Sequence, residues 1–176
     1  MRTHHKALTV LAVLAAAVGV ITGPAALASP DAEPVADPPG TQITAETFAG
    51  KCLDVRTGDS GAPLVQADCD ANSRTQRFWL NTVSGGVEIR TSANLCLDLE
   101  AARPGNGTRI IQYPCGTLPR FTQTFLTFPA GDGLSTIHTV DLGCFDVENG
   151  DEAAGAGIIQ YNCTGGSNES FRFREV

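Results

Sequence analysis

Six cysteines recur at regular intervals, and this regularity constrains the fold more than any other feature of the chain. The members of successive pairs lie 17, 19 and 19 residues apart, and the pairs begin 44 and then 48 residues apart. An even number of cysteines predicts a disulfide framework, for which six residues allow fifteen pairings. The economical pairing closes three short loops, each of which would stabilise the fold by about 3 kcal/mol: Cys52–Cys69, Cys96–Cys115 and Cys144–Cys163.

Zinc ligation is the alternative use of these cysteines. The chain lacks the Cys-Xaa-Xaa-Cys spacing of structural zinc sites. An oxidising compartment, which the N-terminal leader described below predicts, also favours disulfides over thiolates. We therefore expect no metal site and no cofactor.

The cysteines mark three copies of one internal repeat. Around the first cysteine of each copy the sequence reads Lys-Cys-Leu-Asp-Val at 51–55, Leu-Cys-Leu-Asp-Leu at 95–99 and Gly-Cys-Phe-Asp-Val at 143–147. Before the second it reads Leu-Val-Gln-Ala-Asp-Cys at 64–69, Ile-Ile-Gln-Tyr-Pro-Cys at 110–115 and Ile-Ile-Gln-Tyr-Asn-Cys at 158–163. A third block follows as Gln-Arg-Phe at 76–78, Gln-Thr-Phe at 123–125 and Glu-Ser-Phe at 169–171. Three blocks in the same order indicate a repeat architecture.

Within each copy the pattern is one of short strands and turns. Runs rich in β-formers, such as Ile43–Phe48, Val87–Thr91 and Leu134–Val140, alternate with turn clusters such as Pro104–Gly107 and Gly131–Gly133. About four strands per copy make twelve in all. Three copies of about 45 residues are too few for a propeller, so we expect one all-β barrel with pseudo-threefold symmetry.

The N-terminal 28 residues have the pattern of a cleaved secretory signal peptide. A basic start, an apolar run over Ala7–Ile21 and the small-residue site Ala26-Leu27-Ala28 follow one another. The apolar run is shorter than the roughly 20 residues that span a bilayer. We therefore expect a secreted, extracellular product without membrane insertion that begins at Ser29. Residues 29–41, with their prolines and acids, are predicted to form a flexible tail before a domain over 42–176.

Charge excludes one class of partner. Without Arg2 and Lys6 the 12 basic residues fall to 10, against 19 acidic residues, which gives a net charge of about −9. Such an acidic chain is unsuited to nucleic acid or to anionic membrane surfaces.

The three blocks together resemble the ricin B-chain type (R-type) lectin domain over residues 42–176. That resemblance implies a β-trefoil in which each repeat carries a Gln-Xaa-Trp signature, and it implies binding of sugars. Here Phe78, Phe125 and Phe171 replace the tryptophan. Glu169 replaces the glutamine of the third copy, which puts in question the hydrogen bonds that this glutamine normally makes.

A shallow sugar site needs a carboxylate that accepts hydrogen bonds from hydroxyls, an aromatic ring against the C–H face of the sugar, and a nearby polar group. Three aspartates, Asp54, Asp98 and Asp146, lie two residues after a cysteine and between apolar neighbours. Strand alternation predicts that their carboxylates point outward at the same place in each repeat. An isolated aspartate would instead be a solvated or turn-capping acid, but the threefold recurrence favours a site.

The aromatic and polar positions distinguish the three copies. Tyr113 and Tyr161 occupy the position of the family's stacking aromatic, where the first copy has Ala67. The polar contact of the family aligns with Thr75, Thr122 and Asn168. The third copy therefore has the full predicted set of Asp146, Tyr161 and Asn168, and the second has Asp98, Tyr113 and Thr122.

One glutamine in each copy departs from the family's pattern. Many family sites have a glutamine four residues before the second cysteine, whereas Gln66, Gln112 and Gln160 stand three before it. Alternation along a strand would turn these side chains away from the tyrosine face. We interpret them as structural, and we expect the sugar sites to be weaker without that contact.

We therefore expect a non-catalytic, carbohydrate-binding protein whose partners are glycans, with galactosides and xylan-type polysaccharides as candidates. The alternative is a trefoil with decayed sugar sites that acts by protein–protein contact, as an inhibitor or accessory factor. Gly58–Pro63 superficially resembles a protease nucleophile loop, but a histidine upstream of it is missing from the mature chain, where His138 is the only histidine. Paired acids could hydrolyse glycosides, yet the recurrent acids belong to separate repeats.

Trp79 and three glycosylation motifs each allow a structural and a functional interpretation. Trp79 is expected to be a partly buried packing residue rather than an auxiliary stacking surface. Glycosylation motifs begin at Asn106, Asn162 and Asn168, and modification of Asn168 would block the third site.

Overall fold

The computed structural model describes residues 36–176, so the predicted signal peptide and most of the predicted tail lie outside the described residues. The chain forms twelve strands: β1 (Thr41–Glu46), β2 (Cys52–Asp54), β3 (Val65–Ala67), β4 (Phe78–Val83), β5 (Gly86–Thr91), β6 (Cys96–Leu99), β7 (Thr108–Tyr113), β8 (Phe125–Gly131), β9 (Leu134–Thr139), β10 (Gly143–Val147), β11 (Ile158–Asn162) and β12 (Ser170–Glu175). It also forms five short 3₁₀ helices: η1 (Arg74–Gln76), η2 (Glu100–Ala102), η3 (Arg120–Gln123), η4 (Glu148–Gly150) and η5 (Ser167–Glu169).

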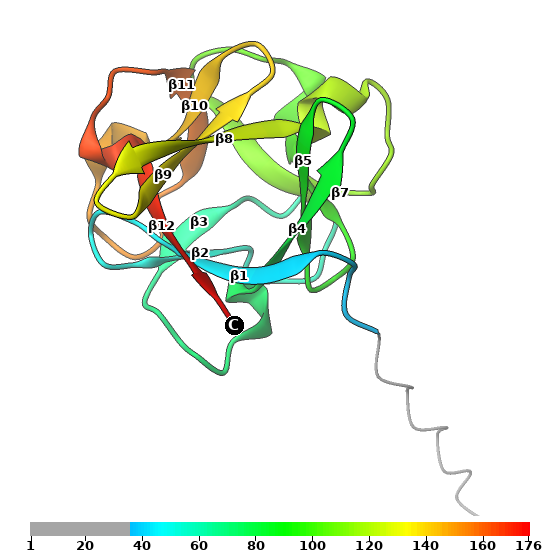
Figure 1. Cartoon of the computed structure of the whole chain (residues 1–176), viewed down its shortest axis with the longest axis horizontal. Helices are drawn as coiled ribbons and strands as arrows, with labels where there is room; N and C mark the ends of the chain where they lie inside the picture. Colours follow the sequence, from blue (N-terminus) through cyan, green and yellow to red (C-terminus); the bar gives the residue numbers. More distant parts are fainter. Residues whose placement is uncertain (1–35) are drawn as a thin grey trace, which may run out of the picture. The chain divides into compact units, whose positions relative to one another are not determined.

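Six strands, two from each repeat, close into a barrel. The antiparallel pairs run from β1 to β4, β5, β8, β9, β12 and back to β1, so no barrel strand has a free edge. Figure 1 shows β1 running beside β12, which joins the first strand of the domain to its last. The predicted all-β barrel with threefold pseudosymmetry, the β-trefoil, is confirmed.

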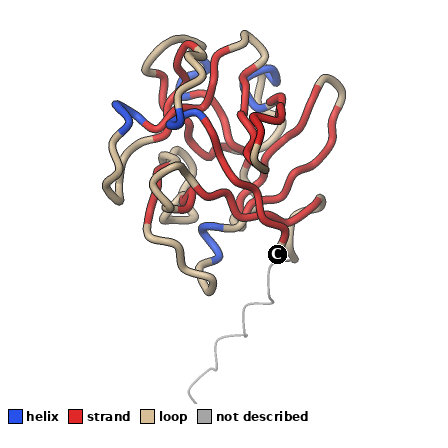
Figure 2. The backbone as a smooth tube through the Cα atoms, turned by 60° about the vertical axis from the view of Figure 1, so that its left-hand side comes forward, coloured by secondary structure: helices blue, strands red, loops and turns tan. Residues whose placement is uncertain are grey.

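The other six strands form three hairpins, β2–β3, β6–β7 and β10–β11, one in each repeat. The hairpins are joined to one another in a ring by backbone hydrogen bonds. Leu64 N donates to Ile110 O at 2.8 Å, Gly107 N to Gln160 O at 2.9 Å, and Ile158 N to Leu64 O at 2.9 Å. Figure 2 shows the strands and the loops between them wound into this single body. Each repeat therefore depends on both of the others.

The apolar core takes the same positions from each repeat. The phenylalanine of the third block is fully buried in every copy, as Phe78, Phe125 and Phe171. Phe125 also packs edge to face against Phe145, with ring centroids 5.0 Å apart. These side chains belong to one hydrophobic core, and each large aromatic side chain contributes a large buried apolar area.

The three disulfides join the predicted partners. Cys52–Cys69, Cys96–Cys115 and Cys144–Cys163 have Cα–Cα distances of 5.0, 5.0 and 5.1 Å, within the usual range for a disulfide. Each one ties the first strand of a hairpin to the loop that follows its second strand. The disulfides therefore hold the end of every hairpin at which the third block begins.

The three repeat glutamines are structural, as their alternation predicts. Gln66, Gln112 and Gln160 are buried. Gln66 Nε2 donates to Asp151 O at 2.7 Å and to Ala153 O at 2.9 Å, in a loop of the third repeat. Gln112 Nε2 donates to Thr57 O and Asp59 O in a loop of the first repeat. Gln160 Oε1 accepts a hydrogen bond from Gly105 N in a loop of the second repeat. Each glutamine thus binds a loop of a neighbouring repeat.

Two residues of the predicted tail contact the domain. Thr41, assigned to the tail by the sequence, already pairs with Leu80 in β4. Just upstream, Asp37 forms an ion pair with Arg74, with Oδ1 and Nη2 3.0 Å apart.

Loss of one of these glutamines should destabilise the whole domain. Gln66→Leu keeps the side-chain volume but removes the two bonds to the third repeat and the bond that Thr47 Oγ1 donates at 2.9 Å. We expect the free energy of unfolding to fall by about 1–3 kcal/mol, because buried partners are left unpaired. Chemical denaturation measures this. Gln42→Leu is the control, since no hydrogen bond involves the Gln42 side chain within residues 36–176, and an equal effect of the two changes would contradict the role assigned to Gln66.

Candidate functional site

Two surface depressions bring together the residues that the sequence predicts for the second and third repeats. One, of about 260 Å³, is lined by Asp98, Tyr113 and Thr122. The other, of about 380 Å³, is lined by Asp146, Tyr161 and Asn168. The larger volume lies within the range of small-molecule sites, and the smaller one lies just below it. We call them the second pocket and the third pocket, after their repeats.

The aspartates are not directed outward as the sequence analysis expects. Asp54, Asp98 and Asp146 are only 7, 6 and 5% exposed. Their strand neighbours lie in the core as predicted, but the short 3₁₀ helix of the third block covers the opposite face of each hairpin strand. Contacts between β6 and η3 and between β10 and η5 bring this about. In the second and third repeats the carboxylates of Asp98 and Asp146 therefore form the floor of a pocket rather than a surface feature.

One oxygen of each carboxylate is held by an amide. Gln76 Nε2 donates to Asp54 Oδ2 at 3.1 Å, and Gln123 Nε2 donates to Asp98 Oδ2 at 2.8 Å. In the third repeat Asn168 Nδ2 takes this role and donates to Asp146 Oδ2 at 2.7 Å. The amide fixes the orientation of the carboxylate, so that its other oxygen has a defined place.

The second oxygen separates the first repeat from the others. Asp54 Oδ1 accepts a hydrogen bond from Arg56 N at 2.5 Å, so both of its oxygens are occupied. Asp98 Oδ1 is buried without a hydrogen-bond partner. Asp146 Oδ1 also accepts no hydrogen bond from residues 36–176, but it is not fully buried. In Asp98 the buried oxygen without a partner is costly, and a ligand hydroxyl would remove that cost.

Glu169 does not simply lose the contacts of the glutamine that it replaces. Its buried carboxylate accepts hydrogen bonds from Thr164 N at 2.7 Å, from Thr164 Oγ1 at 2.7 Å and from Gly165 N at 2.8 Å. A carboxylate cannot donate to Asp146, and the adjacent Asn168 supplies that donor instead. The residue types alone did not predict this exchange of hydrogen-bond roles.

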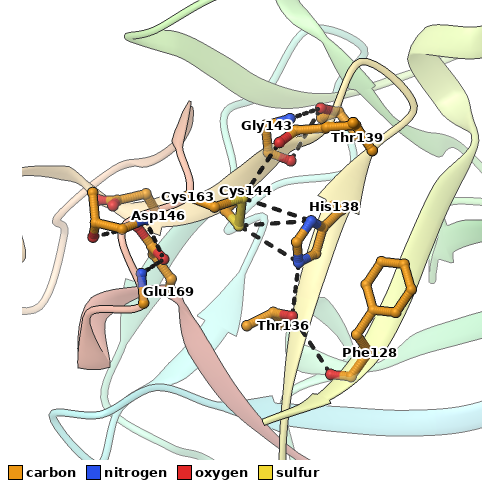
Figure 3. Close-up of a disulfide and its surroundings, with 12 residues drawn as sticks. Phe128, Thr136, His138, Thr139, Gly143, Cys144, Asp146, Cys163 and Glu169 are labelled. Carbon is orange, nitrogen blue, oxygen red and sulfur yellow. Dashed lines mark hydrogen bonds between the residues drawn. A yellow bond between two sulfur atoms is a disulfide. The ribbon is translucent and has the colours of Figure 1, made fainter.

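Two buried acids, Asp146 and Glu169, lie near each other at the third pocket. Burial raises the pKa of Asp146; the hydrogen bond from Asn168 opposes this, and the charge of Glu169 adds to it. Figure 3 shows the Cys144–Cys163 disulfide with His138 on one side and Asp146 and Glu169 on the other. Partial burial lowers the pKa of His138, although the charge of Glu169 opposes the shift, so the ring is neutral at neutral pH.

Each pocket is lined by the ring of one tyrosine, Tyr113 in the second pocket and Tyr161 in the third. Tyr113 and Tyr161 are 40 and 42% exposed, and each lies opposite a half-cystine, Cys96 and Cys144 respectively. Ala67 stands at this place in the first repeat, opposite Cys52. The predicted difference between the repeats therefore holds in space as well as in sequence.

Thr122 is less suited to ligand contact than the alignment suggests. It lines the second pocket, but it is buried and its Oγ1 donates to Pro119 O at 2.9 Å. Its hydroxyl hydrogen is therefore used inside the loop. Asn168 is likewise committed to Asp146 through one amide hydrogen, which leaves its other hydrogen and its oxygen for a ligand.

The walls of the pockets contain residues that sequence reasoning did not single out. The second pocket includes Ala101, Ala102 and Leu118, and the third includes Asn149 and Gly150. These residues follow the aspartate strand or lie in the loop after the second cysteine. The only sequence feature that could have pointed to these wall residues is the greater length of the loop after the second cysteine in the second repeat.

Other candidate features carry no site chemistry. Two groups place ligand-type atoms within 4.8 Å of one another, His138 with Cys144 and Cys163, and Glu88 with Cys96 and Cys115. In both groups the sulfurs belong to a disulfide, so they offer no thiolate to a metal.

The remaining expectations concern packing and the membrane. Trp79 is buried, which fits packing and not a stacking surface. Within residues 36–176 no helix is long and apolar enough to cross a membrane.

Comparison with known families decides the relationship of the chain. The model of the ricin-type beta-trefoil lectin domain matches residues 39–139 and 86–176. The chain belongs to this lectin family. Its domains are generally non-catalytic carbohydrate binders, so membership supports carbohydrate binding as the general function. A comparison with curated proteins finds no match.

Solved structures of this lectin fold agree with the assignment. The designed threefold symmetric protein ThreeFoil is 26% identical, with a TM-score of 0.71 over 77% of this chain and 99% of that one. An exo-β-1,3-galactanase from Clostridium thermocellum is 27% identical, with a TM-score of 0.72 over 80% of this chain but only 31% of the galactanase. The Macrolepiota procera ricin B-like lectin, in complex with lactose, is 16% identical, with a TM-score of 0.66 over 81% of this chain and 99% of that one, and shows the shared fold.

Two substitutions beside Asp146 should shift its pKa in opposite directions. Asn168→Ala removes the hydrogen bond that lowers the pKa of Asp146, so this pKa should rise further. Glu169→Gln removes the charge that raises it, so the pKa should fall. An NMR titration of the Asp146 carboxyl carbon measures both. Shifts of the same sign in the two variants would contradict the arrangement described here.

Proposed function

We propose that the protein is a secreted, non-catalytic lectin that binds glycans in its second and third pockets. One observation carries the proposal: in both pockets, an exposed tyrosine stands beside an aspartate that has one carboxylate oxygen held by an amide and the other without a partner. The signal peptide pattern of residues 1–28 supports the proposal of secretion.

These groups match the two faces of a sugar. The apolar C–H side of a pyranose ring stacks on the tyrosine, and a hydroxyl donates to the free oxygen of the aspartate. In the third pocket Asn168 adds an amide. Because each pocket offers few contacts, we expect dissociation constants of about 0.1–1 mM for one site, which corresponds to about −4 to −5.5 kcal/mol.

The first repeat is not expected to bind sugar. Both oxygens of Asp54 have protein partners, and Ala67 provides no ring. Beside it, Asp68 is engaged by Lys51, with Oδ1 and Nζ 2.7 Å apart. The position therefore lacks both a free acceptor and a stacking face.

Binding at the third pocket should weaken in acid. The proposed contact needs the ionised carboxylate of Asp146, whose pKa is raised by burial. Protonation replaces an acceptor by a donor, so affinity is present above this raised pKa and is lost as the pH falls through it. An ordinary aspartate has a pKa near 3.8. The loss of affinity should therefore begin at a higher pH than the titration of an ordinary aspartate would give.

Removal of the stacking rings tests the proposal. Tyr161→Ala and Tyr113→Ala should each lower affinity at their own pocket by about 1–3 kcal/mol, whereas the domain should stay folded because neither side chain belongs to the buried core. Calorimetric titration with galactosides, xylo-oligosaccharides and other glycans measures the effect.

Two controls accompany these variants. Phe128→Ala removes an aromatic ring of similar exposure that lies against His138 and lines neither pocket, and Ala67→Ser alters the first repeat. Both should leave binding unchanged. If no sugar binds at millimolar concentration, or if Phe128→Ala weakens binding as much as Tyr161→Ala, the lectin proposal fails and the alternative of protein–protein contact takes its place.

A further inference from the structure

The two pockets share a floor but differ in one wall. Ala101 and Ala102 line the second pocket where Asn149 and Gly150 line the third. All four residues have positive φ, with values of 56° and 52° in the second repeat and 58° and 61° in the third. The backbone of the two walls is therefore alike, and the difference lies in the side chains.

The alanines occupy a backbone conformation that does not suit them. The left-handed region is unfavourable for a residue with an ordinary Cβ, whereas asparagine and glycine adopt it more readily. The third repeat has this favourable pair and the second does not. Backbone strain of this kind collects at functional sites, where the surrounding structure maintains it.

A second apolar group faces the same pocket from another direction. Leu118 lines the second pocket and is 80% exposed. It lies in the loop between Cys115 and Gln123, which is two residues longer than the loop between Cys163 and Glu169. Methyl groups from two loops thus flank Asp98 and Tyr113.

The corresponding wall of the third pocket is polar. Glu148 lines it and takes part in no ion pair or hydrogen bond through its side chain within the described range. Its counterpart Glu100 is bound by Arg109, with Nε and Oε2 2.9 Å apart. Gly157 stands at the register position of Arg109 in the third repeat, because Ile158 pairs with Val147 as Ile110 pairs with Leu99.

We propose that the two pockets select different sugars: the second binds a ring that carries an apolar substituent such as an acetamido methyl group, and the third binds the unacylated ring. This inference rests on the proposed function. A methyl group packs on Ala101, Ala102 and Leu118, which releases water from apolar surface. In the third pocket the same methyl group would lie against Glu148 and Asn149 and would cover polar groups without replacing their hydrogen bonds.

Two variants isolate the pockets for the test. Tyr161→Ala leaves the second pocket, and Tyr113→Ala leaves the third. Each is titrated by NMR with galactose, N-acetylgalactosamine, glucose and N-acetylglucosamine. We expect the second pocket to bind one acetylated sugar about 3–10-fold more tightly than its unacylated counterpart, and the third pocket to bind that acetylated sugar no more tightly than the counterpart.

A wall exchange identifies the residues responsible. The double change Ala101→Asn and Ala102→Gly places the third wall in the second pocket, and it suits the backbone, so thermal stability should be retained or increased. We expect the preference for the acetylated sugar to disappear while the unacylated sugar still binds. Leu118→Ser, at a largely exposed position, should reduce the preference in the same direction.

The outcomes separate this inference from the proposed function. Binding in both pockets with the same substituent preference, or a preference that survives the wall exchange, overturns the inference and leaves the lectin proposal intact. Absence of binding by all four sugars in both isolated pockets overturns the inference, and the lectin proposal itself falls only if the wider glycan panel fails as well. A preference confined to the second pocket and lost on exchange supports both.

Discussion

The hydrogen bonds between a buried glutamine of each repeat and a loop of the preceding repeat, with the third repeat preceding the first, hold the three repeats together. Gln66, Gln112 and Gln160 each lie in the second strand of a hairpin, and the following residue points to the opposite face of that strand. In the second and third repeats that following residue is a tyrosine. The same alternation that buries the glutamine therefore exposes the ring, so the interaction that assembles the domain also sets the orientation of its proposed binding surface.

The hydrogen bonding of the buried aspartates is the second feature that links the fold to the proposed sites. A carboxylate in a mostly buried position is stable only with hydrogen-bond partners. The first repeat supplies partners for both oxygens of Asp54, through Gln76 and the Arg56 backbone. The second and third supply one amide each and leave the other oxygen to the pocket. Three copies of one motif thus differ in the hydrogen bonding of their carboxylates, although the motif itself is present in all three.

Much of the fold could be predicted from the sequence, because cysteine spacing and the repeated blocks reflect strand pairing directly. The disulfides, the twelve strands, the buried phenylalanines and the structural glutamines follow from such local patterns. The burial of Asp98 could not be predicted, since it depends on η3 packing over its strand. The role of Asn168 as the hydrogen-bond donor to Asp146, in place of a glutamine at position 169, depends on whether the Asn168 side chain reaches the carboxylate in the folded chain. The walls at Ala101 and Leu118 come from loops whose path follows from tertiary packing and from no sequence period.

A crystal structure of the protein with a glycan that it binds tests the central claim most directly. The account predicts a sugar ring stacked on Tyr113, on Tyr161 or on both, with a hydroxyl within hydrogen-bond distance of Asp98 Oδ1 or Asp146 Oδ1, and no sugar against Asp54 and Ala67. A glycan bound in the first repeat, or on a surface away from both tyrosines, would contradict it.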